Sequence, residues 1–464
     1  MDAGNISAST APSDVLSLIF ERTLGLIHRN EQCRFVIVLA LVCHSWRATC
    51  IDAPNLWSRI GPFVRSYDLV RLYLDRSGNY PLFIDYYETG EDERILPLLA
   101  QESERWSDVR LSIPPPFYRY LSSIRGRLPL LRTLFWGYDE DWYDDMATGT
   151  NDLDTSQAQE DFAGFKIAPV LTQLSFNCPY LKETFPLPWN QLTHLNCTEI
   201  HSSNLYSILL NIPHLSQLTL YRIYNDSIDM EAVVPGDGHT FAPALASLHV
   251  TDCDFQIIQS VLRMIPNVKK ISIVVWERVR MRDCHTPIML PILDSLSIRV
   301  ERSLPYLTQS FKIHAPMLST LELECDDVMD EDDDEDYSDE ELAPVWFVGG
   351  CGSAMLRFLM ELVQEANCSL TSLKLEMEVD FESTAMESLL RVVPCLEHLE
   401  IALVQPEGYD HIPLRAMTPA CSTFPRLKTL YLRFPSCDFT FEDVKELLAF
   451  VSRSTDLEVK FLGK

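Results

Sequence analysis

Residues 204–221 read "NLYSILLNIPHLSQLTLY", and this stretch decides the fold. Starting at Leu205, apolar residues recur at +3, +4 and +7, ending at Ile212. This spacing is typical of one face of an α-helix. Pro213 disfavours helical geometry at the residue before it and cannot continue a helix. Apolar and polar residues alternate after the proline, which predicts a short strand.

The strand half of this stretch recurs along the chain. Its template is proline, any residue, Leu or Val, two residues, an apolar residue, one residue and another apolar residue. Most copies lie 21 to 31 residues apart, in or just above the range of about 20 to 29 residues of leucine-rich repeats. Nine copies begin with proline, at Pro129, Pro169, Pro213, Pro243, Pro266, Pro291, Pro316, Pro394 and Pro425. Two further copies lack the proline and begin at Asn190 and Cys368.

The helical spacing recurs before three further strands, over 258–265, 386–393 and 444–451. Each unit is therefore predicted to be a helix, a sharp stop and a strand. Such units bury both apolar faces only by stacking into a parallel sheet with helices outside. The sequence predicts an α/β solenoid over 64–464, shaped as a horseshoe with the parallel sheet on its concave side. Divergent copies are predicted from Pro81, from Arg105 and in the last ten residues.

Two acidic segments interrupt the repeats, at 137–162 and 326–341. The second holds twelve carboxylates, too many like charges to pack, and is predicted to be a disordered loop. A solubilising role, attraction of a basic substrate tail and phosphorylation of Ser338 are three interpretations of this loop.

Composition excludes several classes of function. The net charge of −29 argues against a nucleic-acid partner, because phosphate binding requires clustered Lys and Arg. The longest apolar run, 35–43, is too short to span a membrane. Thirteen cysteines without a C-x-x-C pair favour reduced thiols over a zinc site or a disulfide framework. A cytoplasmic or nuclear location is expected.

The first 60 residues differ from the repeats. Residues 1–10 are polar and are predicted to be disordered. The stretch 12–27 places apolar residues on one helical stripe, and a second helix is predicted to carry Leu39 to Trp46 before Pro54 ends the pattern. Two or three short helices cannot enclose this much apolar and aromatic area. Part of it is expected to be covered by another surface.

These N-terminal residues resemble the F-box (F-box-like) domain, whose pattern runs "LP..IL..IF", "L..VC..W" and "P.LW". The resemblance covers about 11–60, and F-box domains followed by irregular leucine-rich repeats are a known architecture. Ala11 departs from the usual leucine, and "GLIHRNEQCRF" at 25–35 lengthens the link between helices. The matching residues are Pro12, Leu16, Ile19, Phe20, Leu39, Val42, Cys43, Trp46, Arg47, Pro54, Leu56 and Trp57.

The resemblance implies a substrate receptor of a Skp1-cullin-F-box ubiquitin ligase. The F-box would bind a Skp1-type adaptor and, through it, a cullin, while the repeats would hold an unknown protein substrate. The implied adaptor-binding residues are Pro12, Val15, Leu16, Ile19, Phe20, Leu39, Val42, Cys43, Trp46, Leu56 and Trp57. The candidate substrate-facing residues are the polar strand positions Gln217, Tyr221, His249, Glu322, His398, Tyr431 and Arg433.

Other interpretations stay open. Trp46 and Trp57 are also typical core residues, and the N-terminal helices could merely cap a non-catalytic leucine-rich-repeat scaffold. The chain lacks G-x-x-x-x-G-K-[ST], G-x-S-x-G, H-E-x-x-H and G-x-G-x-x-G motifs. Its histidines and carboxylates show no ligand spacing. The sequence therefore predicts no catalytic residue, no cofactor and no metal site.

Overall fold

The computed structural model places two compact units, Met1–Leu215 and Ser216–Lys464, which are described separately as the N-terminal and C-terminal units. Residues 1–10 and the predicted acidic inserts, apart from Gly137 and Asp326, lie outside the described residues. The described residues are 11–87, 92–137, 163–177, 185–224, 242–275, 287–301, 311–326, 351–378, 388–389, 391–404, 426–433 and 458–462.

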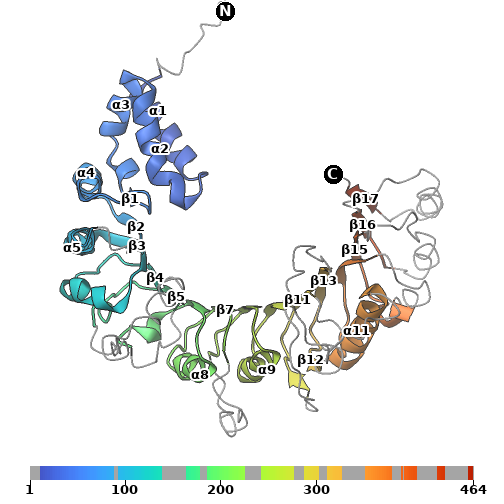
Figure 1. Ribbon diagram of the computed structural model, residues 1–464. Helices are drawn as coiled ribbons and strands as arrows, with labels where there is room; N and C mark the ends of the chain where they lie inside the picture. The colour runs from blue at the N-terminus through green and yellow to red at the C-terminus, as the bar shows by residue number, and fades with distance from the viewer. Residues whose placement is uncertain are drawn as a thin grey trace, which may run out of the picture. The chain divides into compact units, whose positions relative to one another are not determined.

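The N-terminal unit begins with helices. The first three pack on one another and on the short 3-10 helix η2, and α4 packs against η2 and the first strand. Figure 1 shows α1, α2 and α3 together at the β1 end of the strand row. The bounds are α1 (Ser13–Leu24), α2 (Arg29–Val42), α3 (His44–Ile51), η2 (Pro54–Trp57), α4 (Tyr67–Ser77), α5 (Ile95–Gln101) and α8 (Ser202–Leu210).

The chain breaks at Cys43, where one continuous helix was predicted. Cys43 is extended, with φ −158° and ψ 171°, and its Sγ accepts a hydrogen bond from the Trp46 backbone N–H at 3.5 Å. This side chain caps the first turn of α3, so Leu39 and Trp46 belong to two helices. The predicted link 25–35 is also wrong in part, since α2 already begins at Arg29.

Parallel strands form the sheet of the N-terminal unit. They pair in chain order from β1 to β6. Short 3-10 helices connect some of them: η3 (Ser103–Arg105), η4 (Pro115–Ile124) and η5 (Trp189–Gln191). The strands are β1 (Arg59–Ile60), β2 (Leu82–Tyr87), β3 (Trp106–Ser112), β4 (Thr133–Gly137), β5 (Gln173–Asn177) and β6 (His194–Thr198).

The C-terminal unit repeats this arrangement, with a parallel sheet in the order β7-β8-β9-β11-β13-β14-β15-β16-β17. Helices α9 (Phe255–Met264) and α11 (Cys351–Ala366) lie on the same side of its strands (Figure 1). Strands β10 (Ile288–Met289) and β12 (Ile313–His314) form a separate parallel pair. The sheet strands are β7 (Gln217–Tyr221), β8 (Ser247–Thr251), β9 (Lys270–Val275), β11 (Ser295–Glu301), β13 (Thr320–Asp326), β14 (Ser372–Glu378), β15 (His398–Val404), β16 (Thr429–Arg433) and β17 (Glu458–Leu462).

The repeat template predicted these strands correctly. In all eleven copies a strand begins two residues after the first Leu or Val, as β7 does after Leu215. The divergent copies at Pro81, at Arg105 and near the C-terminus correspond to β2, β3 and β17. The mixed α/β class with a large parallel sheet is therefore confirmed.

The alternation of the strands also agrees with the prediction. Leu218 and Leu220 of β7 and Leu321 and Leu323 of β13 are buried, while the residues between them are at least partly exposed. Because paired strands keep the same register, these buried positions form continuous apolar rows. One face of each sheet is thus core and the other is polar.

The helices predicted within the repeats are confirmed where the structure describes them. Helices α8 and α9 occupy the first two predicted segments. Of the third, residues 388–389 and 391–392 are helical. The fourth, 444–451, lies outside the described residues.

Candidate protein-interaction surfaces

Helix α1 has two apolar faces. Its spacing brings Leu16, Phe20 and Leu24 to the inner face, where each is at most 3% exposed. Val15, Leu18 and Ile19 lie on the outer face and are 44%, 56% and 50% exposed. The i, i+3, i+4 spacing makes these three side chains neighbours on the helix surface. An exposed apolar stripe therefore runs along α1.

Helix α2 repeats this division. Val36 and Leu39 are buried, whereas Val38, Leu41 and Val42 are 49%, 69% and 56% exposed. The exposed three again have i, i+3, i+4 spacing, so they form a second apolar stripe. The two triplets are called the α1 stripe and the α2 stripe below.

The implied adaptor-binding residues fall into three groups. Leu16, Phe20, Leu39, Leu56 and Trp57 are buried within their own chain and cannot contact a partner in this conformation. Cys43 and Trp46 are partly exposed. Pro12, Val15, Ile19 and Val42 are exposed.

The buried aromatic residues hold the helices together. The ring of Phe20 lies 4.9 Å from that of Trp46, and Trp57 packs edge-on against Tyr73 of α4 at 5.0 Å. The Trp57 Nε1 donates a hydrogen bond to the Cys50 carbonyl at 2.7 Å. Both tryptophans thus contribute to packing, as the core interpretation of the sequence required.

Polar contacts join α2 to the sheet and to α4. Arg29, the first residue of α2, donates two hydrogen bonds to the Asp108 carboxylate of β3, at 2.9 and 3.1 Å, and lies 3.7 Å from Asp85 of β2. Tyr73 donates a hydrogen bond from its hydroxyl to the Cys33 carbonyl at 2.6 Å. The bidentate arginine pair fixes both distance and orientation.

Burial controls the electrostatics of this joint. Asp85 is 3% exposed, and desolvation raises the pKa of its carboxyl although Arg110 and Arg29 oppose the shift. Its two oxygens accept no hydrogen bond from the residues that the structure describes. Desolvation, with Arg29 nearby, also lowers the pKa of Arg59. The contact between α2 and the sheet therefore holds Asp85 where ionisation of its carboxyl group costs free energy.

The seven candidate substrate-facing residues share one face of the C-terminal sheet. The register places His249, Glu322 and Tyr431 in one row across the strands. Gln217 and His398 lie in the row on one side of it. Tyr221 and Arg433 lie in the row on the other side. The structure thus brings side chains far apart in sequence onto one surface.

Several of these residues already have partners within the chain. Glu322 forms an ion pair with Lys374, and His398 Nδ1 lies 2.6 Å from the Thr429 hydroxyl. Burial lowers the pKa of His249, which keeps this ring neutral. Part of this polar face is therefore already paired within the chain.

Neither a metal site nor a membrane-crossing segment is found in the described ranges. Within them, His, Cys, Asp and Glu side chains do not gather in groups of three that could hold a metal ion. None of their helices has the length and apolar character that crossing a membrane requires.

No family model and no curated protein matches this sequence.

Sequence reasoning missed Leu18, Val38 and Leu41, which complete the two stripes. These three residues lie outside the F-box pattern. Counting apolar spacing separately on each helix would have found them, because each triplet has i, i+3, i+4 periodicity. Their exposure depends on which helix face packs inward, and only the tertiary structure gives that.

Proposed function

We propose that this protein is the substrate receptor of a Skp1-cullin-F-box type ubiquitin ligase. In this proposal α1 and α2 bind the Skp1-type adaptor, and the repeats form a leucine-rich-repeat horseshoe that holds a protein substrate on its polar sheet face. The receptor carries no chemistry of its own and acts in the cytoplasm or nucleus.

The observation that carries the proposal is the pair of exposed apolar stripes on α1 and α2. Val15, Ile19 and Val42 belong both to these stripes and to the residues implied by the F-box resemblance. Large contiguous apolar patches on soluble monomers often mark interaction sites.

Covering the two stripes would supply a substantial part of the free energy of binding. Six aliphatic side chains about half exposed would each contribute roughly 1 kcal/mol when fully covered, or on the order of 6 kcal/mol in total before ordering costs. Hydrogen bonds and further apolar contacts at the rim would add to this.

The test is capture of a purified Skp1-type adaptor by the full chain. We expect the wild-type chain to bind and the double variant Val15→Asp with Ile19→Asp to lose at least about a hundredfold in affinity, because both charges would enter an apolar interface. These two positions are exposed, so the variant should keep its fold.

Leu210→Asp is the matched control. Leu210 is 61% exposed on α8, so it introduces the same kind of charge on an exposed helix surface away from the stripes. Its adaptor affinity should equal that of the wild type. Undiminished capture by the double variant would remove the adaptor-binding part of the proposal.

A second function, a repeat scaffold whose helices only cap the sheet, is supported by the contacts of α2. The bidentate pair between Arg29 and Asp108 and the hydrogen bond from Tyr73 to Cys33 tie these helices to their own chain. A cap requires those contacts but not the exposed stripes. A wild-type chain that fails to bind any Skp1-type adaptor would favour the scaffold.

A further inference from the structure

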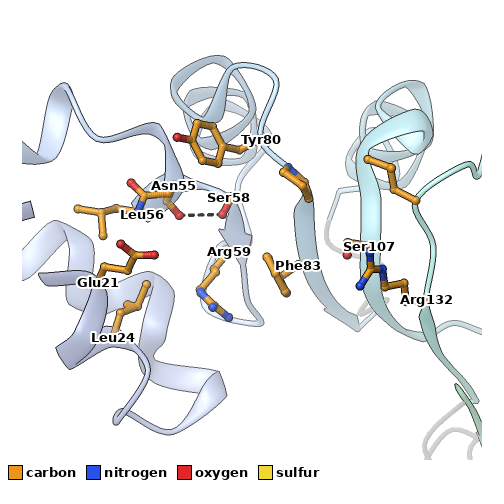
Figure 2. A pocket seen from close by; sticks show the side chains of 12 residues that line it. Glu21, Leu24, Asn55, Leu56, Ser58, Arg59, Tyr80, Phe83, Ser107 and Arg132 are labelled. Atoms are coloured by element: carbon orange, nitrogen blue, oxygen red, sulfur yellow. Dashed lines mark hydrogen bonds between the residues drawn. The ribbon is translucent and has the colours of Figure 1, made fainter. Parts of the chain in front are cut away.

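A pocket of about 380 Å³ lies in the N-terminal unit, between α1 and η2 on one side and the beginnings of β1 to β4 on the other. Figure 2 shows Glu21 on the α1 side, Arg132 on the opposite side and Phe83 between Arg59 and Arg132. The residues of the α1 stripe do not line this pocket.

The floor of the pocket is preorganised. The Arg59 guanidinium lies over the Phe83 ring, 4.4 Å from its centroid, and donates a hydrogen bond to Gln32 at 3.0 Å. Leu24 and Leu56, which also line the pocket, are buried. A guanidinium fixed by stacking and by a neutral amide loses little freedom when it binds an anion.

The rim carries a second arginine, Arg132. Arg132 is exposed and forms no side-chain hydrogen bond or ion pair within the described part of the chain. Tyr80 and Leu130, also on the rim, are 48% and 42% exposed. Tyrosine and arginine beside apolar groups are the composition that protein interfaces favour.

The apolar rim continues into the next repeat. The pairing of Thr133 with Gln173 makes Val170 the counterpart of Leu130, and the Thr172 N–H bonds to the Arg132 carbonyl at 3.0 Å. Val170 and the nearby Ile167 are 40% and 50% exposed. Leu130, Val170 and Ile167 are called the apolar strip below; the strip begins at the arginine pocket, which Leu130 lines.

We propose that this pocket and strip bind an acidic, apolar-flanked peptide segment of a partner protein. A carboxylate of the segment would lie between Arg59 and Arg132, and a neighbouring apolar side chain would cover Leu130 and Val170.

Charge complementarity favours an acidic segment. The pocket lining has two arginines against one glutamate, whereas the whole chain has a net charge of −29. Charges more than about 8 Å away are largely screened at physiological ionic strength, so the local arginines dominate. A basic segment would meet Arg59 and Arg132 directly. This inference does not depend on adaptor binding, because it uses other residues.

The test is selection of random 12-residue peptides displayed on phage, using the full-length wild-type chain as bait. We expect the selected peptides to carry Asp or Glu beside Leu, Ile or Phe. A fluorescein-labelled selected peptide should bind the wild type, and Arg132→Glu should weaken that binding at least about tenfold. Binding should also weaken as salt concentration rises.

Arg125→Glu is the matched control, because Arg125 is an exposed arginine of the same unit that does not line the pocket. It should change affinity less than about twofold. Tyr80→Ala should weaken binding without altering the circular dichroism spectrum. Enrichment of Lys or Arg, absence of enrichment, equal binding by Arg132→Glu, or equal loss in Arg125→Glu would each overturn the proposal.

Discussion

Helices α1 and α9 carry six apolar residues each, yet they bury them differently. All six in α9 are buried, and so is Gln259. In α1 only Leu16, Phe20 and Leu24 are buried, and the other three form the exposed α1 stripe. Apolar content alone therefore does not decide whether a helix is enclosed.

The difference comes from what each helix packs against. Helix α9 packs against β10, and Phe255 at its start contacts Phe311 across 5.5 Å. Helix α1 packs against α3 and η2 on its inner side. Within the described residues, its outer side has no comparable cover. A helix packed on one side presents its second apolar face for binding.

Replacing one buried and one exposed isoleucine by alanine should show this difference between the two helices most strongly. Ile258→Ala in α9 should cost about 2–5 kcal/mol of the free energy of unfolding, because it removes buried methyl groups and leaves a cavity. Ile19→Ala in α1 should change it by no more than about 0.5 kcal/mol. Urea unfolding of both variants checks this. Equal costs would mean that α1 is covered on both faces.

Tyr73→Phe tests whether a hydrogen bond fixes α4 to α2. It removes the hydroxyl that donates a hydrogen bond to the Cys33 carbonyl, which should cost about 0.5–1.5 kcal/mol. Tyr80→Phe, at an exposed ring, is the control and should have no effect on the urea midpoint. A silent Tyr73→Phe would show that this hydrogen bond does not hold α4 to α2.

Asp85→Asn should have a smaller, pH-dependent effect. Burial raises the pKa of Asp85 above its ordinary value of 3.8, so the folded state favours the protonated carboxyl. The stability that the protonated Asp85 carboxyl contributes is fully present below pH 3.8. It is lost as pH rises through the pKa of Asp85 in the folded state. An amide does not ionise, so the variant should gain on the wild type as pH rises above 3.8.

Urea midpoints across this pH range measure the gain, with the exposed Asp75→Asn as control. A difference that does not grow with pH would show that the Arg29 and Arg110 charges fully compensate burial.

Alkylation of the native chain should have the smallest effect, because the thiols of Cys50 and Cys253 are expected not to react. Burial raises the pKa of Cys50 in α3 to about 11 and that of Cys253, just before α9, to about 12. At pH 8 less than about one in a thousand of each would be thiolate. Peptide mapping after iodoacetamide treatment should find both unlabelled in the native chain and labelled after denaturation. Rapid labelling of Cys50 alone would show that the N-terminal helices open and that α9 does not.

Much of the fold could be predicted from local sequence. Every template copy gave a strand, and the prolines ended helices such as α8 before the strands began. These features depend on period and backbone geometry, which residues a few positions apart determine. The break at Cys43 could not be predicted, since a thiol capping a helix leaves no strong sequence signal.

The candidate surfaces were predictable only in part. The F-box pattern named Val15, Ile19 and Val42, but it also named Leu16 and Phe20, which the fold buries. Arg59 and Arg132 were not singled out, because the pocket joins residues of α1, η2, three strands and the segment before β4, which the sequence does not show to be neighbours.

The sequence by itself determined the repeating helix-strand unit, the apolar and polar faces of the strands and the excess of apolar residues in α1 and α2. Tertiary structure alone decided which of those apolar residues stay exposed, which strands pair and where Arg29 meets Asp108, 79 residues away. The physical reason is range: periodicity acts within one element, whereas burial and ion pairing depend on surfaces that meet only when distant segments pack together.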